Sequence, residues 1–302
     1  MWFKNLIIYR LTKWEHTLES MQEEFSRQAL LPCGGGDLQT RGWVSPKGEG
    51  EPLVHKAGDH LLISLGFEKK LLPSSVINQF AKARAAEIEE REGYKPGRKQ
   101  MKEIKEAVTD ELLPRAFAIR SRINAWIDTK GKWLIVDASS SNKADDLIGM
   151  LMKSLNGVSM IPLKTKTSPV VAMTSWLTEN DSPPQFSVDQ DCELKSRGEH
   201  AATVRYVKHS LEIEEIAKHT KGGKDVTRLA MTWADKVSFM LHENMQLKRI
   251  APLDIIKEQA AMDADGDAFD TDFVLMTGEL TKLIDAMVEV LGGMFEHEKM
   301  AA

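Results

Sequence analysis

Cysteine is scarce in this 302-residue sequence, which contains only Cys33 and Cys192. The two residues are far apart, and neither has a cysteine or histidine at the short spacing of a zinc site. Scarce cysteine argues against a disulfide framework and favours a reducing compartment. The sequence also lacks any apolar run near the roughly 20 residues that a membrane-spanning helix needs.

The N-terminal segment, residues 1–10, is apolar but short. Lys4 interrupts it and no small-residue cleavage site follows, so the segment does not resemble a secretory signal peptide. We therefore expect a cytoplasmic protein without a membrane partner. The composition, with 42% hydrophobic and 28% charged residues, is typical of a soluble globular protein that buries a sizeable core.

Signatures of common catalytic and phosphate-binding sites are missing as well. The glycine run 34–36 follows a predicted helix rather than a strand and has no Lys-Ser/Thr after it, so it is not a phosphate loop. No His-Glu-x-x-His or Gly-x-Ser-x-Gly motif occurs. These absences predict a protein that is not an enzyme and that uses no cofactor.

One acidic segment, residues 263–267, resembles the start of a calcium loop. Such a loop needs glycine at its sixth position and a bidentate glutamate at its twelfth, where this chain has Ala268 and Val274. A solvated acidic loop is therefore the preferred interpretation, and we expect no metal site. A metal-dependent nuclease would need clustered carboxylates, and the one cluster in the sequence is 263–272.

Charge is distributed very unevenly along the chain. Residues 95–132 contain ten Lys and Arg against five Asp and Glu, whereas residues 254–302 contain three against twelve, and the whole chain has a net charge of −5. A local excess of cations can bind a polyanion even when the total charge is negative. Residues 95–132 are therefore the first candidate for a nucleic-acid contact.

Two interpretations of the basic block remain open. Lysine- and glutamate-rich helices are usually only solvated faces. However, Lys95, Arg98, Lys99 and Lys102 cluster around one turn with few acidic residues nearby, and Arg115, Arg120 and Arg122 extend the excess. Phe117 is likewise open, because a lone phenylalanine is normally buried in a core, whereas an exposed one would suit docking to a partner subunit.

Apolar periodicity predicts an α+β fold. Strands are expected at 2–11, 42–44, 60–67, 117–127, 132–136 and 158–163, and helices at 17–30 and 142–154. Two charged helices, 73–91 and 98–111, are separated by the break at 93–97 and predict a helical hairpin. A second unit follows the loop 178–184, with strands at 203–208, 227–233, 236–241 and 247–252 and helices at 213–219, 253–262 and 278–291.

These elements predict a layered central α/β domain (1–72 and 115–177), a projecting helical hairpin (73–114) and a second α+β domain (178–302). The last predicted helix, 278–291, carries a broad apolar stripe that includes Leu280, Leu283, Ile284 and Met287.

Several longer motifs resemble the RdgC family of recombination-associated proteins from end to end. They are Trp2-Phe3-Lys4-Asn5-Leu6, Tyr9-Arg10-Leu11, Leu31-Pro32-Cys33-Gly34, Gly42-Trp43-Val44, Lys70-Leu71-Leu72-Pro73, Leu112-Leu113-Pro114-Arg115-Ala116-Phe117, Trp126-Ile127-Asp128 and Phe273-Val274-Leu275-Met276-Thr277-Gly278-Glu279-Leu280. The resemblance implies a bacterial, nucleoid-associated, non-enzymatic protein. It also implies a ring-shaped homodimer that binds duplex DNA with little sequence preference and restrains the RecA recombinase, with weaker binding of single-stranded DNA.

The resemblance also implies roles for individual positions. Phe117 would insert into the partner subunit, Arg115 would lie beside the central hole, and Lys208 and His209 would face DNA, although relatives have glutamine where this chain has His209. The expected DNA-binding residues are Lys95, Arg98, Lys99, Lys102, Arg115, Arg120, Arg205, Lys208 and His209. The expected dimer-interface residues are Leu113, Phe117, Leu280, Leu283, Ile284 and Met287.

A protein-interaction inhibitor of the recombination machinery, for which DNA binding is incidental, is the alternative hypothesis. Charge reversal of Lys99, Arg115 and Lys208 together distinguishes the two hypotheses. Inhibition of strand exchange that survives the loss of DNA binding would favour the protein-interaction hypothesis.

Overall fold

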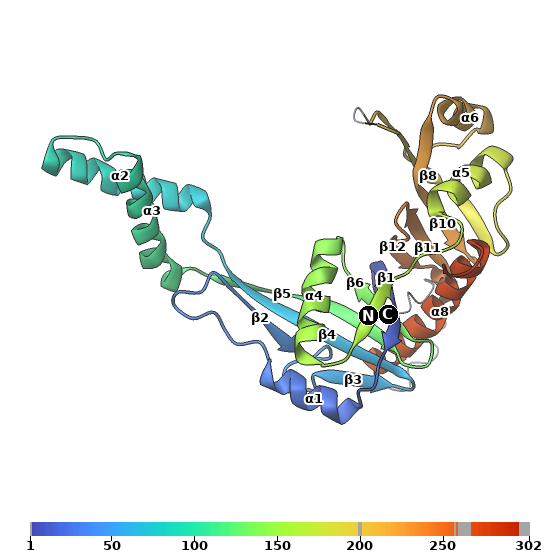
Figure 1. Ribbon diagram of the computed structural model, residues 1–302, viewed down its shortest axis with the longest axis horizontal. Helices are drawn as coiled ribbons and strands as arrows, with labels where there is room; N and C mark the ends of the chain where they lie inside the picture. Colours follow the sequence, from blue (N-terminus) through green and yellow to red (C-terminus); the bar gives the residue numbers. More distant parts are fainter. Residues whose placement is uncertain (1, 199–200, 257, 259–266, 296–302) are drawn as a thin grey trace, which may run out of the picture.

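The computed structural model describes residues 2–198, 201–256, 258 and 267–295. In Figure 1 the chain forms an open crescent, with a helical hairpin at one end and the C-terminal half of the chain at the other. Helices and strands are both abundant, which confirms the predicted α+β class. Within the described residues, no helix is long and apolar enough to cross a membrane.

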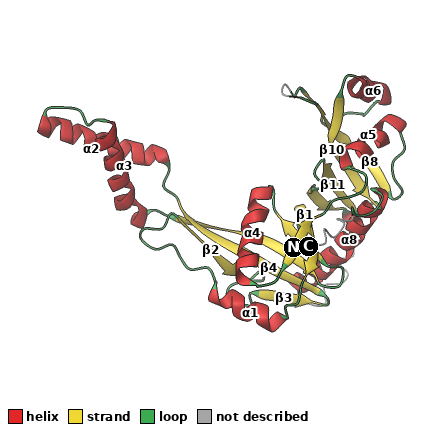
Figure 2. Cartoon of the chain, viewed as in Figure 1, coloured by secondary structure: helices red, strands yellow, loops and turns green. Residues whose placement is uncertain are grey.

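A single antiparallel sheet runs through the crescent (Figure 2). Twelve strands belong to it within the described residues. They are β1 Asn5–Lys13, β2 Gln39–Val44, β3 Val54–Ala57, β4 His60–Lys70, β5 Ala118–Asp128, β6 Trp133–Asp137, β7 Ser159–Pro162, β8 Phe186–Ser196, β9 Thr203–Tyr206, β10 Lys224–Trp233, β11 Val237–His242 and β12 Leu247–Pro252. Their order is β2-β4-β5-β6-β1-β12-β11-β10-β8-β9, with β3 beside β4 and β7 beside β1.

The N-terminal half of the sheet is covered on one face by α1 (Leu18–Arg27) and α4 (Ser141–Ser154). Phe25 of α1 stacks on Trp43 of β2 with 3.9 Å between ring centroids. The Trp43 indole N–H donates to Ser154 Oγ of α4 at 2.8 Å, so one buried aromatic residue ties both helices to the sheet. Thr17 and Ser20 form a reciprocal capping box that begins α1.

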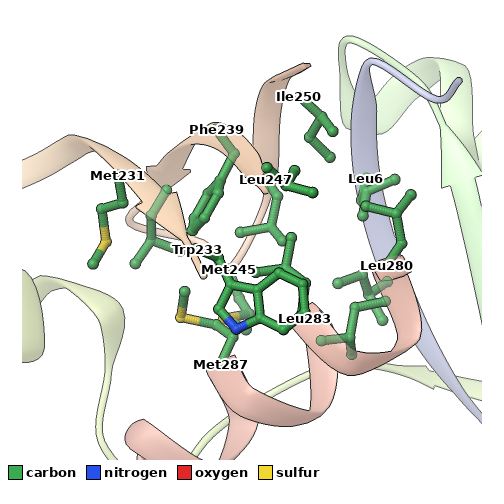
Figure 3. Close-up of a cluster of buried hydrophobic side chains, with 14 of the residues drawn as sticks. Leu6, Met231, Trp233, Phe239, Met245, Leu247, Ile250, Leu280, Leu283 and Met287 are labelled. Atoms are coloured by element: carbon green, nitrogen blue, oxygen red, sulfur yellow. The ribbon is translucent and has the colours of Figure 1, made fainter. Parts of the chain in front are cut away.

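The C-terminal half packs its strands against α5 (Pro169–Glu179), α6 (Ile213–Lys221) and α8 (Ala268–Val290). Figure 3 shows the apolar face of α8 among Leu6, Trp233 and Leu247. Strand β1 pairs with β12, which joins this half of the sheet to the other. Side chains of both halves therefore share one hydrophobic cluster.

The structure corrects most of the expected dimer interface. Leu280, Leu283, Ile284 and Met287 are 0% exposed, because the sheet of their own chain already covers this face of α8. Leu113, in a short 3-10 helix at Leu113–Arg115, is also buried, at 3% exposed. None of these five side chains offers a surface to a second subunit in this fold.

The hairpin of α2 (Ser74–Glu92) and α3 (Arg98–Leu112) follows β4 and precedes β5 in the chain, and it projects from one end of the crescent (Figure 1). Gly93 ends α2 in the left-handed region at φ +78°, which a glycine adopts without a Cβ clash. A small apolar core joins the two helices, with Ala81, Ala85, Ile104 and Val108 as its buried residues, and an Arg84–Glu111 ion pair at 3.0 Å also links them. The hairpin is therefore a thin, charged projection.

Three strands and α-helices are not anticipated by the sequence patterns: β3, α5 and β8. Buried side chains of α5, including Met173 and Leu177, pack with the C-terminal sheet, on the far side of the boundary that we predict near residue 178. Helix α8 begins at Ala268, ten residues before the predicted start at 278. Half of the predicted helix 253–262, and all of the acidic segment 263–266, lie outside the described residues.

Candidate nucleic-acid interface

The predicted cations of the hairpin are exposed at the start of α3 and in the loop before it. The side chains of Lys95 and Lys102 are 81% and 79% exposed. Although few acidic residues lie nearby in the sequence, both lysines have an acidic partner: Lys95 lies 4.0 Å from Glu89 and Lys102 lies 3.5 Å from Glu106. Exposed ion pairs of this kind contribute little, about 0–1 kcal/mol, so both ammonium groups remain available to another anion.

The basic block continues past the hairpin with Arg115 and Arg120, which differ in whether they are paired with an acidic residue. Arg115 is exposed, whereas the Arg120 guanidinium donates to Glu68 at 2.7 Å. That hydrogen bond, together with the backbone N–H of Cys33, holds the pKa of Glu68 below its usual value. Arg120 is thus committed to its own sheet, and Arg115 is the freer candidate for a phosphate contact.

Phe117 is 84% exposed, so the core interpretation of this residue is wrong. Its carbonyl accepts from the Leu71 N–H at 2.7 Å, which ties the segment after α3 to the end of β4. Leu38, Leu71 and Ile119 are also exposed, at 58%, 46% and 52%. We call Leu38, Leu71, Phe117 and Ile119 the junction patch, because they lie where the hairpin meets the sheet.

A second group of cations gathers on the C-terminal sheet. In the strand register, Arg205 lies opposite Glu193, Glu193 opposite Arg228, and Arg228 opposite His242. Since opposed residues of antiparallel strands point to the same face, these side chains form a row across β9, β8, β10 and β11. Neighbours such as Leu229 and Leu241 point to the opposite, helix-covered face.

Glu193 holds this row together. It is 8% exposed, and its carboxylate accepts from Arg205 Nε at 2.5 Å and from an Arg228 terminal nitrogen at 3.3 Å. The Thr227 hydroxyl also donates to Glu193, to its backbone carbonyl and to its carboxylate. A buried carboxylate between two guanidinium groups fixes their positions, while more than two-fifths of each arginine side chain stays exposed.

Asp191 organises the edge of the same face. One of its oxygens accepts from the Lys208 backbone N–H at 2.8 Å, and the other from an Arg249 terminal nitrogen at 3.4 Å. Lys208 and Arg249 both have left-handed backbone, at φ +51° and +53°, which side-chain-bearing residues adopt only when their surroundings hold them. Lys208 and His209 are exposed at this edge.

His242 lies among these cations. Burial, followed by repulsion from Lys248 and Arg228, lowers its pKa from 6.5 to about 4. The imidazole is therefore neutral at pH 7, and the positive charge of this face comes from arginine and lysine.

The low pKa of His242 predicts how stability changes with pH. Between about pH 6.5 and 4 the unfolded chain binds a proton at this residue that the folded chain does not bind, so the free energy of unfolding falls as pH falls through this window. Urea denaturation at pH 7 and pH 5 should show a smaller loss for His242→Gln than for the unchanged protein. An equal loss in both proteins would contradict the buried, neutral state of His242.

The structure separates the predicted cations into two groups. Lys95, Arg98, Lys99, Lys102 and Arg115 belong to the hairpin arm of the crescent, whereas the row on the C-terminal sheet belongs to the other arm (Figure 1). Sequence reasoning missed Arg228, Lys248 and Arg249. The sequence pattern of residues 224–233 could have identified Arg228, because side chains alternate between the two faces of a strand and Arg228 stands between the buried Thr227 and Leu229.

Within the described residues, no group of three or more His, Cys, Asp or Glu side chains is arranged to hold a metal ion. Burial and the neighbouring Glu193 raise the pKa of the Cys192 thiol to about 12, so it is a protonated core residue.

Comparison with known proteins gives a consistent result. A family model described as "RdgC: Putative exonuclease, RdgC" matches residues 1–294. The chain is 52% identical to the recombination-associated protein RdgC of Herminiimonas arsenicoxydans, over 97% of this chain and 98% of that protein. It is 51% identical to the protein of the same name from Janthinobacterium sp. (strain Marseille), over 99% and 100%. The identity to the Bordetella pertussis protein is 50%, over 97% and 99%.

Proposed function

This chain belongs to the RdgC family, whose relatives are named recombination-associated proteins, and from that membership we propose that it binds duplex DNA without sequence preference. The observation that supports this most is the pair of exposed cationic groups on the two arms of the crescent. Phosphate contacts from several lysines and arginines supply affinity that does not depend on sequence.

The second part of the proposal is a homodimer that closes around the duplex. Phe117 and the rest of the junction patch form an exposed apolar surface. A second subunit that covers this surface would remove it from water, which favours association. Two crescents joined through their hairpin ends and again through their other ends would form a ring. Cations from both subunits would then face the enclosed DNA.

Phe117→Ala should weaken self-association and leave folding intact. The side chain is 84% exposed, so its removal creates no cavity, and we expect a free energy of unfolding within about 0.5 kcal/mol of the unchanged protein. Sedimentation velocity should show a higher dimer dissociation constant for Phe117→Ala, and duplex affinity should fall with it.

Val171→Ala is a matched control, because Val171 is also an exposed apolar residue, at 59%, on a different element. A large loss of thermal stability in Phe117→Ala, or unchanged association, would reject the dimer role of Phe117.

The biological consequence that we propose is restraint of RecA-mediated recombination in the nucleoid of the cytoplasm. Duplex occupied by the ring would be unavailable to the recombinase. We further propose that the protein is not an enzyme, uses no cofactor and binds single-stranded DNA more weakly. Incubation of labelled duplex with the protein and magnesium tests the non-enzymatic part, and shortened products would contradict it.

Two unrelated duplexes of equal length test the DNA-binding proposal. We expect dissociation constants within about threefold of each other, because phosphate contacts carry no base information. A preference of a hundredfold would indicate readout of base edges and overturn the proposal.

A further inference from the structure

A pocket of about 460 Å³ opens on the charged face of the C-terminal sheet. Its walls come from β8, β9, β10, β11 and β12, with Asn5 of β1 at one side. This volume is within the roughly 300–1,000 Å³ of small-molecule sites. The hairpin arm has a pocket of the same volume, but there Lys102 and Lys105 are matched by Glu106 and Asp110, so that pocket lacks an excess of positive charge.

Positive charge exceeds negative charge in the pocket. Arg205, Arg228, Lys248 and Arg249 line it together with two carboxylates, Asp191 and Glu193. The remaining titratable lining groups are uncharged at pH 7. His242 has a pKa of about 4, the Cys192 thiol has a pKa of about 12, and burial raises the pKa of Tyr206 above its usual value. Four cationic and two anionic side chains therefore leave the pocket with a net charge of +2.

The cations are fixed before any ligand arrives. Glu193 orients Arg205 and Arg228, Asp191 orients Arg249, and the Lys248 ammonium donates to the Ser139 carbonyl at 2.9 Å. Burial and repulsion from Arg228 lower the pKa of Lys248, so an anion beside it would relieve an unfavourable interaction. Ordering costs on binding are small when the recognising groups are already held.

We propose that this pocket binds a phosphate monoester, as carried by a free nucleotide or by the 5′ end of a DNA strand. A monoester carries about −1.5 to −2 charges at pH 7, which matches the net positive charge of the pocket, whereas a phosphodiester within a strand carries one. Met240 and Val207 supply an apolar wall beside the cations for the attached nucleoside. The DNA-end form of this proposal rests on the proposed DNA-binding function.

Calorimetric titration of the full chain with 5′-dTMP and with thymidine tests the site. We expect 5′-dTMP to bind and thymidine not to bind. Arg228→Gln should weaken 5′-dTMP binding by at least about tenfold, because a hydrogen bond to a charged group is lost. Lys248→Gln, on a different strand, should weaken it similarly, which guards against a folding defect in one variant.

Arg197→Gln is the matched control, because Arg197, directly after β8, also pairs with a carboxylate, at 2.6 Å from Asp225 of β10, but does not line the pocket. It should leave 5′-dTMP affinity unchanged. No binding of 5′-dTMP at millimolar concentration, equal binding of thymidine, or indifference to both Arg228→Gln and Lys248→Gln would overturn the proposal.

Two further measurements distinguish DNA ends from free nucleotides as the ligand, and the pocket proposal from the proposed DNA-binding function. Tighter binding of duplex with 5′-phosphate ends than with 5′-hydroxyl ends would identify DNA ends as the ligand, whereas equal binding together with 5′-dTMP affinity would identify free nucleotides. A duplex closed by hairpin loops at both ends has no terminal phosphate. Its binding tests the proposed function alone, so either proposal can fail while the other stands.

Discussion

Reversing the charges of Lys99, Arg115 and Lys208 together is expected to weaken duplex binding by at least about a hundredfold, because each change replaces a phosphate-attracting charge with a repelling one. All three side chains are exposed, and they come from both arms of the crescent. Fluorescence anisotropy with a labelled duplex at moderate salt would measure the change. Circular dichroism should show an unchanged fold, since none of the three side chains is in the core.

The control is a second triple variant with the same change in net charge, made at exposed lysines outside the two groups. Lys13, Lys56 and Lys221 are suitable positions. An equal loss of affinity in both triple variants would mean that net charge, rather than the two local groups, determines binding.

The same variant distinguishes the proposed mechanism from an inhibitor that acts through protein contacts. If the Lys99, Arg115 and Lys208 reversal abolishes DNA binding but RecA-catalysed strand exchange remains inhibited, the protein-interaction hypothesis is correct. If inhibition disappears in parallel with DNA binding, occupation of the duplex explains it.

Leu283→Ala is expected to destabilise the fold by about 2–5 kcal/mol, the usual cost of truncating a buried leucine. Leu283 is 0% exposed and lies in the cluster that joins α8 to the C-terminal sheet (Figure 3). Chemical denaturation monitored by tryptophan fluorescence would measure this loss.

Thr281 provides a comparison on the same helix, since it is only partly buried and Thr281→Ala removes no large apolar group. If the Leu283→Ala protein keeps its stability but loses self-association, α8 forms part of the dimer interface, and its assignment to the core is contradicted.

The α2–α3 hairpin could be predicted closely from the sequence. Helices predicted at 73–91 and 98–111 form at Ser74–Glu92 and Arg98–Leu112, because the Gly93–Gly97 interval breaks a strong helical pattern. Strand β8 was missed because register shifts disturb its pairing with β10 and polar residues interrupt its alternation. Helix α5 was missed because its apolar residues are not confined to one stripe.

The site could be predicted only in part, since its geometry depends on cross-strand register. Arg205, Glu193 and Arg228 are distant in sequence, and only the pairing of β9, β8 and β10 makes them neighbours. An apolar stripe on a helix also does not reveal what covers it, and the expectation that α8 forms an interface rests on the family resemblance alone. The exposure of Phe117 was equally undecided until its place at the end of the sheet was known.

The dependence of duplex affinity on salt tests the electrostatic mechanism most directly. The ligand should be a duplex closed at both ends, so that only backbone phosphates contribute. Each phosphate contact contributes about −0.9 to the slope of log affinity against log salt concentration, so about five contacts predict a slope near −4 or steeper. A slope near zero between about 50 and 200 mM salt would show that the two cationic groups do not hold the DNA backbone, and would contradict the mechanism.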